Sequence, residues 1–184
     1  MRNRYNWIQW AIVFIVCVFM VVSFLLPWWS GDVISFYGEA SIDIYGWGIP
    51  DQESFIKEYM LSDITPSSKV TLSWVFLSIC VVTAILGSWL GKKARAMLLG
   101  ISGVGILAYS LVAYFIVIAQ RLSDYSIKPR GESIIESSGM YAYSVRADIG
   151  LGFYLACITG CVLVILALIE AICHGLTKRI PQEE

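Results

Sequence analysis

The sequence predicts an all-α membrane protein, a four-transmembrane-helix bundle that carries a small extracytoplasmic antiparallel β-cap. Three observations lead to this fold class. Of the 184 residues, 58% are apolar, whereas soluble domains are about 45–50% apolar. Four apolar runs are each long enough to cross a bilayer core of about 30 Å as a helix. The connection after the first run contains alternating polar and apolar residues, which are typical of strands.

The four apolar runs define a single membrane domain, 1–184, with spans at about 8–26, 70–90, 96–119 and 149–172. The first run follows two arginines, as the apolar part of a signal peptide would. It is longer than a typical 7–15-residue apolar region of a signal peptide, however, and it ends in Pro-Trp-Trp instead of a small-residue cleavage site. We therefore expect it to remain in the protein as the first span.

The distribution of charge predicts the orientation. The connection 29–69 has seven acids and two bases, and the connection 121–148 has four of each. In contrast, the short connection 91–95 has three bases and no acid, and both chain ends carry basic residues. Basic residues near span ends favour the cytoplasmic side. Both termini and the basic connection are therefore expected in the cytoplasm, with outer loops at 29–69 and 121–148, in a plasma or cytoplasmic membrane.

The first outer loop is expected to form a β-hairpin. Residues 32–37 are rich in β-branched and aromatic side chains, and residues 39–45 alternate strictly between apolar and polar. Gly38-Glu39 between them fits a two-residue type II′ turn, which favours glycine first. Residues 141–146 alternate in the same way and could add a strand to this hairpin.

Two other outer segments have distinct patterns. Residues 52–61 place their apolar side chains on one helical stripe, which predicts a short amphipathic helix. Residues 128–132 are polar and rich in turn formers, so we expect this part of the second outer loop to be mobile.

Two aromatic positions carry a resemblance to a known family. Trp29 follows the first span directly, and Tyr45-Gly46-Trp47 comes soon after it. This arrangement resembles the W…G-L-W portion of the claudin signature. The topology as a whole resembles the claudin-like group, which includes claudins, peripheral myelin protein and calcium-channel gamma subunits. The resemblance implies a helical bundle with an outer β-cap.

The chain departs from the claudin pattern in two respects, of which the first is that Gly46-Trp47 lacks the intervening leucine of G-L-W. The second is that claudins have two outer cysteines joined in a disulfide, whereas all five cysteines here lie in apolar runs. The alternative interpretation of Trp29 and Trp47 is that they are separate interfacial anchors, because tryptophan prefers the headgroup level of a bilayer.

Small residues recur at close spacing in three of the spans. Such residues let helix backbones approach one another in lipid. They predict packing within the bundle or, alternatively, association with other membrane chains. The glycines concerned are Gly87, Gly91, Gly100, Gly103, Gly152 and Gly160.

Polar and sulfur-containing residues in the fourth span offer two candidate sites. Glu170 is the one acidic residue inside a span, and His174 and Lys178 follow it at four-residue intervals. We expect a structural ladder that reaches the cytoplasmic headgroups, with a proton relay as the alternative. Cys157 and Cys161 share a helix face, where buried small residues are the expected role and a soft-metal site the alternative.

The sequence contains no motif of a hydrolase, an intramembrane protease or a nucleotide-binding protein, so we expect no catalytic, cofactor or metal site. The leading functional hypothesis is a non-enzymatic accessory subunit or interaction scaffold that acts through its outer cap and helix faces. The alternative is a small transporter or channel component that forms a pathway on oligomerisation. Expected partners are membrane lipids and other membrane proteins or further copies of the chain, with no nucleic acid.

Overall fold

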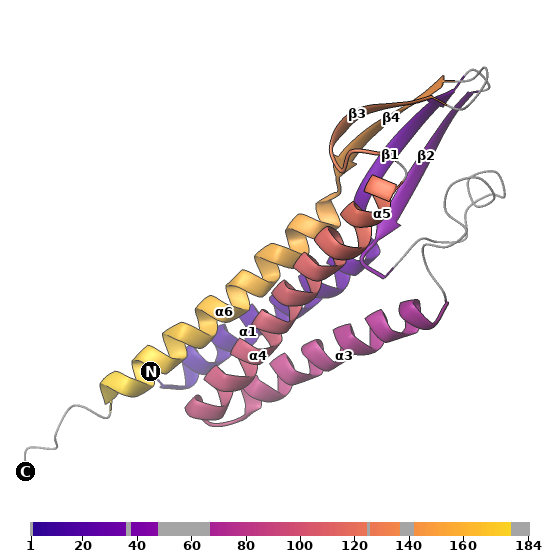
Figure 1. Cartoon of the computed structure of the whole chain (residues 1–184). Coiled ribbons are helices and arrows are strands. Elements are labelled where there is room, and N and C mark those ends of the chain that lie inside the picture. Colours follow the sequence, from indigo (N-terminus) through magenta and orange to yellow (C-terminus); the bar gives the residue numbers. More distant parts are fainter. Residues whose placement is uncertain (1, 36–37, 48–66, 125, 137–141, 178–184) are drawn as a thin grey trace, which may run out of the picture.

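The computed structural model describes residues 2–35, 38–47, 67–124, 126–136 and 142–177. Long helices pack side by side, and a four-stranded antiparallel sheet extends from one end of the bundle (Figure 1). Helix α1 begins and helix α6 ends at the opposite end of the bundle. We call these two ends the sheet end and the loop end, because the short connection between α3 and α4 lies at the second.

Four helices are long and apolar enough to cross a membrane, as the sequence predicted. The qualifying stretches are Trp7–Leu25, Leu72–Trp89, Lys92–Ile118 and Leu151–Cys173. They lie in α1 (Arg2–Leu25), α3 (Ser67–Trp89), α4 (Lys92–Leu111) with its π-helical continuation η2 (Val112–Ile118), and α6 (Leu151–Thr177). A short helix, α5 (Ala119–Asp124), extends η2.

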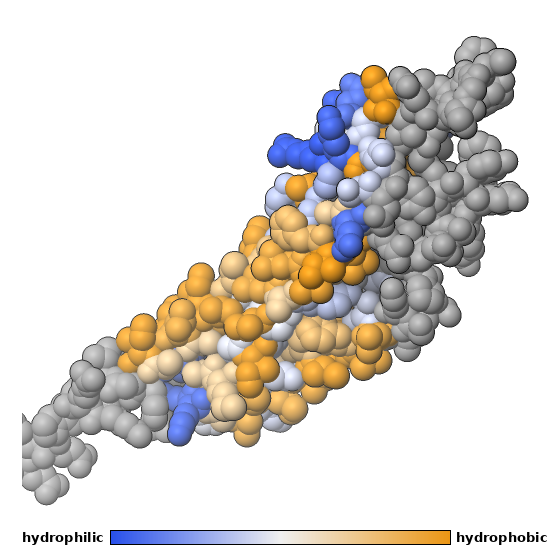
Figure 2. All heavy atoms as spheres, viewed as in Figure 1, coloured by the Kyte–Doolittle hydropathy of each residue, from blue (hydrophilic) through white to orange (hydrophobic). Residues whose placement is uncertain are grey.

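Helix packing forms a closed ring. Helix α4 packs against α6 and α3, and α1 packs against α6 and α3. On the face seen in Figure 2, hydrophobic side chains cover the helices, and hydrophilic ones lie mainly at the sheet end with a smaller group at the loop end. Large apolar side chains such as Phe14, Val82 and Phe115 are exposed on these flanks. The outside of the ring therefore suits contact with lipid.

The sheet has the order β2-β1-β4-β3 and is antiparallel throughout. Its strands are β1 (Pro27–Ser35), β2 (Gly38–Tyr45), β3 (Gly131–Glu136) and β4 (Ala142–Ile149). One face buries apolar side chains, and the other exposes polar ones, which is the usual arrangement of a sheet covered on one side. The buried face carries Trp29, Ile42, Ile44, Val145 and Ala147.

The predicted position of the hairpin turn is wrong by two residues. Ser35 pairs with Gly38, so residues 36–37, outside the described part, connect the strands, and Gly38-Glu39 belongs to β2. The predicted turn would have put Gly31 opposite Gly46. The observed register instead puts Gly31 opposite Ile42, and the buried apolar pairs decide the register.

The second outer loop contains one expected strand and one unexpected strand. Strand β4 pairs with β1, as the alternation of residues 141–146 predicted. Strand β3 was not predicted, and it begins within residues 128–132, which were expected to be mobile. The Lys128 amide donates a hydrogen bond to Ser133 Oγ at 2.8 Å, which orders this turn. The amphipathic helix predicted at 52–61 lies outside the described residues.

Candidate functional site

Trp28 joins the sheet to the bundle. Its side chain is 0% exposed, and its indole N–H donates to the Ser23 carbonyl of α1 at 2.8 Å. Its ring meets Phe24 of α1, Tyr109 of α4 and Phe153 of α6 edge-on, with centroids 5.5, 6.1 and 6.0 Å away. Edge-on aromatic pairs add to the free energy of burial. The start of β1 is therefore fixed to three helices.

Gly46 lies directly against the Trp28 ring. A Cβ atom on Gly46 would lie 2.5 Å from Trp28 Cζ2, so only glycine fits there. The Tyr109 hydroxyl donates to the Gly46 carbonyl at 2.6 Å and shares a 2.7 Å hydrogen bond with Ser73 of α3. The glycine selected by the claudin resemblance thus connects the end of β2 to two helices.

Trp29 and Trp47 make different contacts at the junction of sheet and bundle. Trp29 is 1% exposed, and its indole N–H donates to the Pro129 carbonyl at 3.0 Å. The half-buried Trp47 ring instead stacks on Tyr45 at 5.3 Å and lies 6.5 Å from Trp74 of α3. Trp29 therefore contacts the segment before β3, whereas Trp47 contacts α3.

Trp28 belongs by sequence only to the Pro-Trp-Trp end of the first apolar run, yet it fills the centre of the junction. An irregularity in the β1–β2 register between Pro27 and Trp29 explains how the adjacent Trp28 and Trp29 are both buried. A β-bulge interrupts the alternation of a strand and can turn neighbouring side chains the same way. Two adjacent tryptophans after a proline are the signal that could have indicated this bulge.

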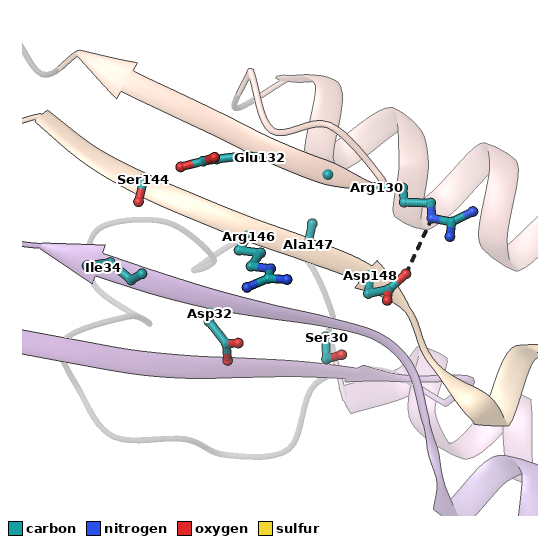
Figure 3. A pocket seen from close by; sticks show the side chains of 10 residues that line it. Ser30, Asp32, Ile34, Arg130, Glu132, Ser144, Arg146, Ala147 and Asp148 are labelled. Carbon is teal, nitrogen blue, oxygen red and sulfur yellow. Dashed lines mark ion pairs between the residues drawn. The ribbon is translucent and has the colours of Figure 1, made fainter.

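The exposed face of the sheet forms a hollow of about 610 Å³, which we call the charged hollow (Figure 3). The register places Arg146 of β4 opposite Asp32 of β1 on one side and opposite Glu132 of β3 on the other. Asp32, Arg146 and Glu132 thus form a charged row across the strands. Beside this charged row, Arg130 Nε lies 3.6 Å from Asp148 Oδ1. Both members of that ion pair are exposed, so it adds at most about 1 kcal/mol to stability.

Two exposed apolar side chains border the charged hollow at the far end of the sheet. Ile34 and Ile134 both lie opposite Ser144 in the register, and they are 45% and 70% exposed. They share the solvent-facing side with the charged row. Apolar groups next to charges are typical of protein-binding surfaces.

A second polar cluster lies inside the bundle at the loop end. Arg95 of α4 donates from Nη1 to Gln9 Oε1 of α1 at 2.7 Å, and the same nitrogen lies 3.5 Å from Glu170 Oε1 of α6. The Gln9 amide also donates to Glu170. Glu170 is 6% exposed. These three residues connect three helices within the membrane-spanning part.

Glu170 has a partner that the sequence did not predict, Arg95 on another helix. Glu170 turns toward the bundle interior because Arg95, at the start of α4, can pair with it there. A buried carboxylate is tolerable only when it is paired and hydrogen-bonded. The side chain of His174 lies outside the described residues, as does Lys178.

The π-helical segment η2 contains a second buried hydroxyl at the sheet end. Tyr114 packs on Phe153 with ring centroids 4.4 Å apart. Within the described residues its hydroxyl has no hydrogen-bond partner. Short π-helical segments occur often at functional positions, but the nearest contacts of this ring are aromatic.

Most of the candidate glycines pack within the bundle. A Cβ atom on Gly103 would lie 2.8 Å from the Gly160 carbonyl oxygen, and one on Gly87 would lie 2.9 Å from Leu98 Cβ. A Cβ atom on Gly152 would likewise lie 2.7 Å from the Ser23 carbonyl oxygen. These positions need glycine because helix backbones, or a helix and β1, approach closely.

Two further glycines have looser surroundings. Gly100 leaves an ordinary distance of 3.5 Å between an added Cβ atom and Ala167 Cβ. Gly91 would meet nothing within 4 Å, and it precedes α4 as its N-cap residue. Among the described residues, Gly91 therefore makes no close helix contact within the chain.

The cysteines differ in burial, and the burial expected of Cys157 and Cys161 is partial in the first and absent in the second. Cys17 and Cys80 are buried, Cys157 is half-buried, and Cys161 and Cys173 are exposed. Among the residues that the structure describes, no group of three histidine, cysteine or carboxylate side chains could hold a metal ion.

No protein-family model, curated protein or solved structure matches this chain. The architecture shown is four long apolar helices with a four-stranded antiparallel sheet in the described part of the chain.

Proposed function

We propose that this chain is a non-enzymatic membrane protein that acts as an accessory subunit or interaction scaffold through its sheet. The observation that carries this proposal is the contrast between the two faces of the sheet. One face is fixed to the bundle around Trp28 and Trp29. The other face is exposed and arranges the charges of Asp32, Glu132 and Arg146 on a rigid support. Such a surface needs no partner inside the chain and is suited to one outside it.

The proposed orientation places the sheet end on the extracytoplasmic side. Lys92 and Lys93 are exposed at the loop end, whereas Glu39 and Asp43 add acidic charge to the sheet. The positive-inside tendency then assigns the loop end to the cytoplasm of a plasma or cytoplasmic membrane.

Buried hydroxyl groups in the spans argue against a transport pathway within one chain. Ser102 donates to the Cys80 carbonyl of α3 at 2.8 Å, and Ser110 donates to the Ile106 carbonyl at 2.8 Å. Thr159 likewise donates to the Ala156 carbonyl. These groups satisfy backbone acceptors instead of lining a wet passage. A channel would need several copies of the chain.

The architectural resemblance supports the same proposal. The claudin-like group includes calcium-channel gamma subunits, which are accessory chains by name.

The polar cluster of Gln9, Arg95 and Glu170 supports a structural role for the bundle. Its charges are paired within the chain, so the cluster holds the helices together.

Site-specific photo-crosslinking in native membranes tests the proposal. A photoreactive amino acid replaces exposed Ser41 on the sheet, exposed Val104 on the flank of α4, or exposed Lys92 at the loop end as the control. The proposal expects one membrane protein to be captured in near-stoichiometric yield from Ser41 or Val104, and none from Lys92.

Two other outcomes would contradict it. Capture of copies of this chain alone, with ion conductance by the purified oligomer in liposomes, would identify a channel component. Failure to capture any protein from all three positions would remove the interaction role.

A further inference from the structure

We infer that the charged hollow is the docking site for a basic segment of a partner protein, an inference that rests on the interaction function proposed above. The hollow, of about 610 Å³, has the size of a typical binding pocket. It lies on the open face of the sheet and is therefore accessible without any rearrangement of the bundle (Figure 3).

The two carboxylates at the centre of the hollow are available for a partner. Asp32 and Glu132 flank Arg146 in the register. In the described part of the chain, however, neither lies within 4 Å of the Arg146 guanidinium. The adjacent Asp148 pairs with Arg130 at 3.6 Å. The row therefore presents two unpaired acidic groups about a central base.

The wider surface adds to this acidic character. On the solvent-facing side, Glu39 of β2 lies opposite Ile34 and Asp43 lies opposite Ser30. The acids on this side outnumber Arg130 and Arg146, and the whole connection 29–69 has seven acids against two bases. Charge complementarity thus favours a basic partner, which this field would attract during encounter.

The apolar border of the charged hollow favours partner side chains with long aliphatic portions. Ile34 and Ile134 stand at one end of the hollow, beside the charged row. Lysine and arginine can lay their methylene groups on apolar surface while their charged heads reach carboxylates. The occupant we assign is therefore a protein segment with lysine or arginine residues, and Arg146 limits how many cations it accepts.

Peptide binding to the full chain tests this assignment. The chain is placed in nanodiscs of zwitterionic phosphatidylcholine, which do not attract basic peptides by themselves. Three twelve-residue peptides serve as probes. In each, valine alternates with one other residue, which is lysine, glutamate or serine. We expect the lysine probe to bind most tightly, and its affinity to fall several-fold between about 50 and 200 mM salt.

Variants of exposed residues locate the binding. The double variant Asp32→Asn with Glu132→Gln should weaken the lysine probe about tenfold, since each lost contact of this kind is worth a factor of a few. Arg146→Gln should tighten it two- to threefold because it removes a repulsive charge. Asp43→Asn, on the same side of the sheet but outside the hollow, is the matched control and should change the affinity less than twofold.

Several results would overturn the inference. Equal binding of the three probes would exclude charge selection, and an equal loss in Asp43→Asn would indicate a diffuse acidic field instead of a site. A salt-sensitive dimer of the chain that the double variant abolishes would assign the face to a second copy.

The crosslinking experiment separates this inference from the proposed function. A partner captured from Ser41 through a segment without basic residues would refute the docking site and leave the interaction function standing. Binding of the lysine probe without any captured partner would instead refute the function.

Discussion

Trp28 is the residue whose loss should most clearly separate the cap from the bundle. Its ring is completely buried among aromatic residues of three helices. Truncation of such a ring to alanine costs about 3–5 kcal/mol, and the lost hydrogen bond to the Ser23 carbonyl adds about 1 kcal/mol. At about 2–4 °C per kcal/mol for a chain of this size, Trp28→Ala should lower the melting temperature by roughly 8 to 24 °C.

Thermal unfolding in mild detergent, followed by near-ultraviolet circular dichroism, measures this effect. Trp89→Ala is the matched control because Trp89 is 72% exposed, and its melting temperature should change by only about 1–3 °C. Trp47→Ala should fall between the two, since Trp47 is half-buried against Tyr45 and Trp74. Similar small shifts for Trp28→Ala and Trp89→Ala would refute the argument that the cap is packed onto the bundle.

Three other predictions address the bundle and its orientation. Glu170→Leu should destabilise the chain by about 3–5 kcal/mol because it leaves the half-buried Arg95 without a counter-charge, and adding Arg95→Leu should recover most of that loss. Detergent unfolding of both variants checks this, and no recovery would contradict it. Gly103→Ala should lower stability by about 1–3 kcal/mol through overpacking against α6, whereas Gly91→Ala should cost only a few tenths, and equal melting temperatures would argue against the close helix contact. In a cysteine-free background, a cysteine at Ser41 should react with an impermeant thiol reagent from outside intact cells, and one in the α3–α4 connection should not; the reverse pattern would invert the orientation.

The sequence predicted the helices well because a span needs only a long apolar run. It also predicted the buried face of the second hairpin strand, since Ile42 and Ile44 alternate with polar residues and are buried. The error in the turn moved the pairing by an even number of residues, so no side chain changed face.

The unpredicted features depend on contacts between distant residues. Strand β3 has adjacent isoleucines at 134 and 135, which break the alternation that indicates a strand. It is a strand because β4 supplies its hydrogen-bond partners. Arg95 belongs by sequence to a basic turn, and nothing local indicates that its guanidinium reaches Glu170 on another helix.

The position of β1 in the middle of the sheet sets an order of assembly. Strand β1 follows the first span directly, but its second neighbour, β4, is synthesised only after the third span. Until then, one edge of β1 has no strand to pair with, and an unpaired edge promotes association with other chains. A ribosome-bound chain that ends before residue 142 would therefore hold an open hairpin on an incomplete bundle. Completion of the sheet and insertion of α6 are expected to occur as one late step, because only the short link at Gly150 separates β4 from α6.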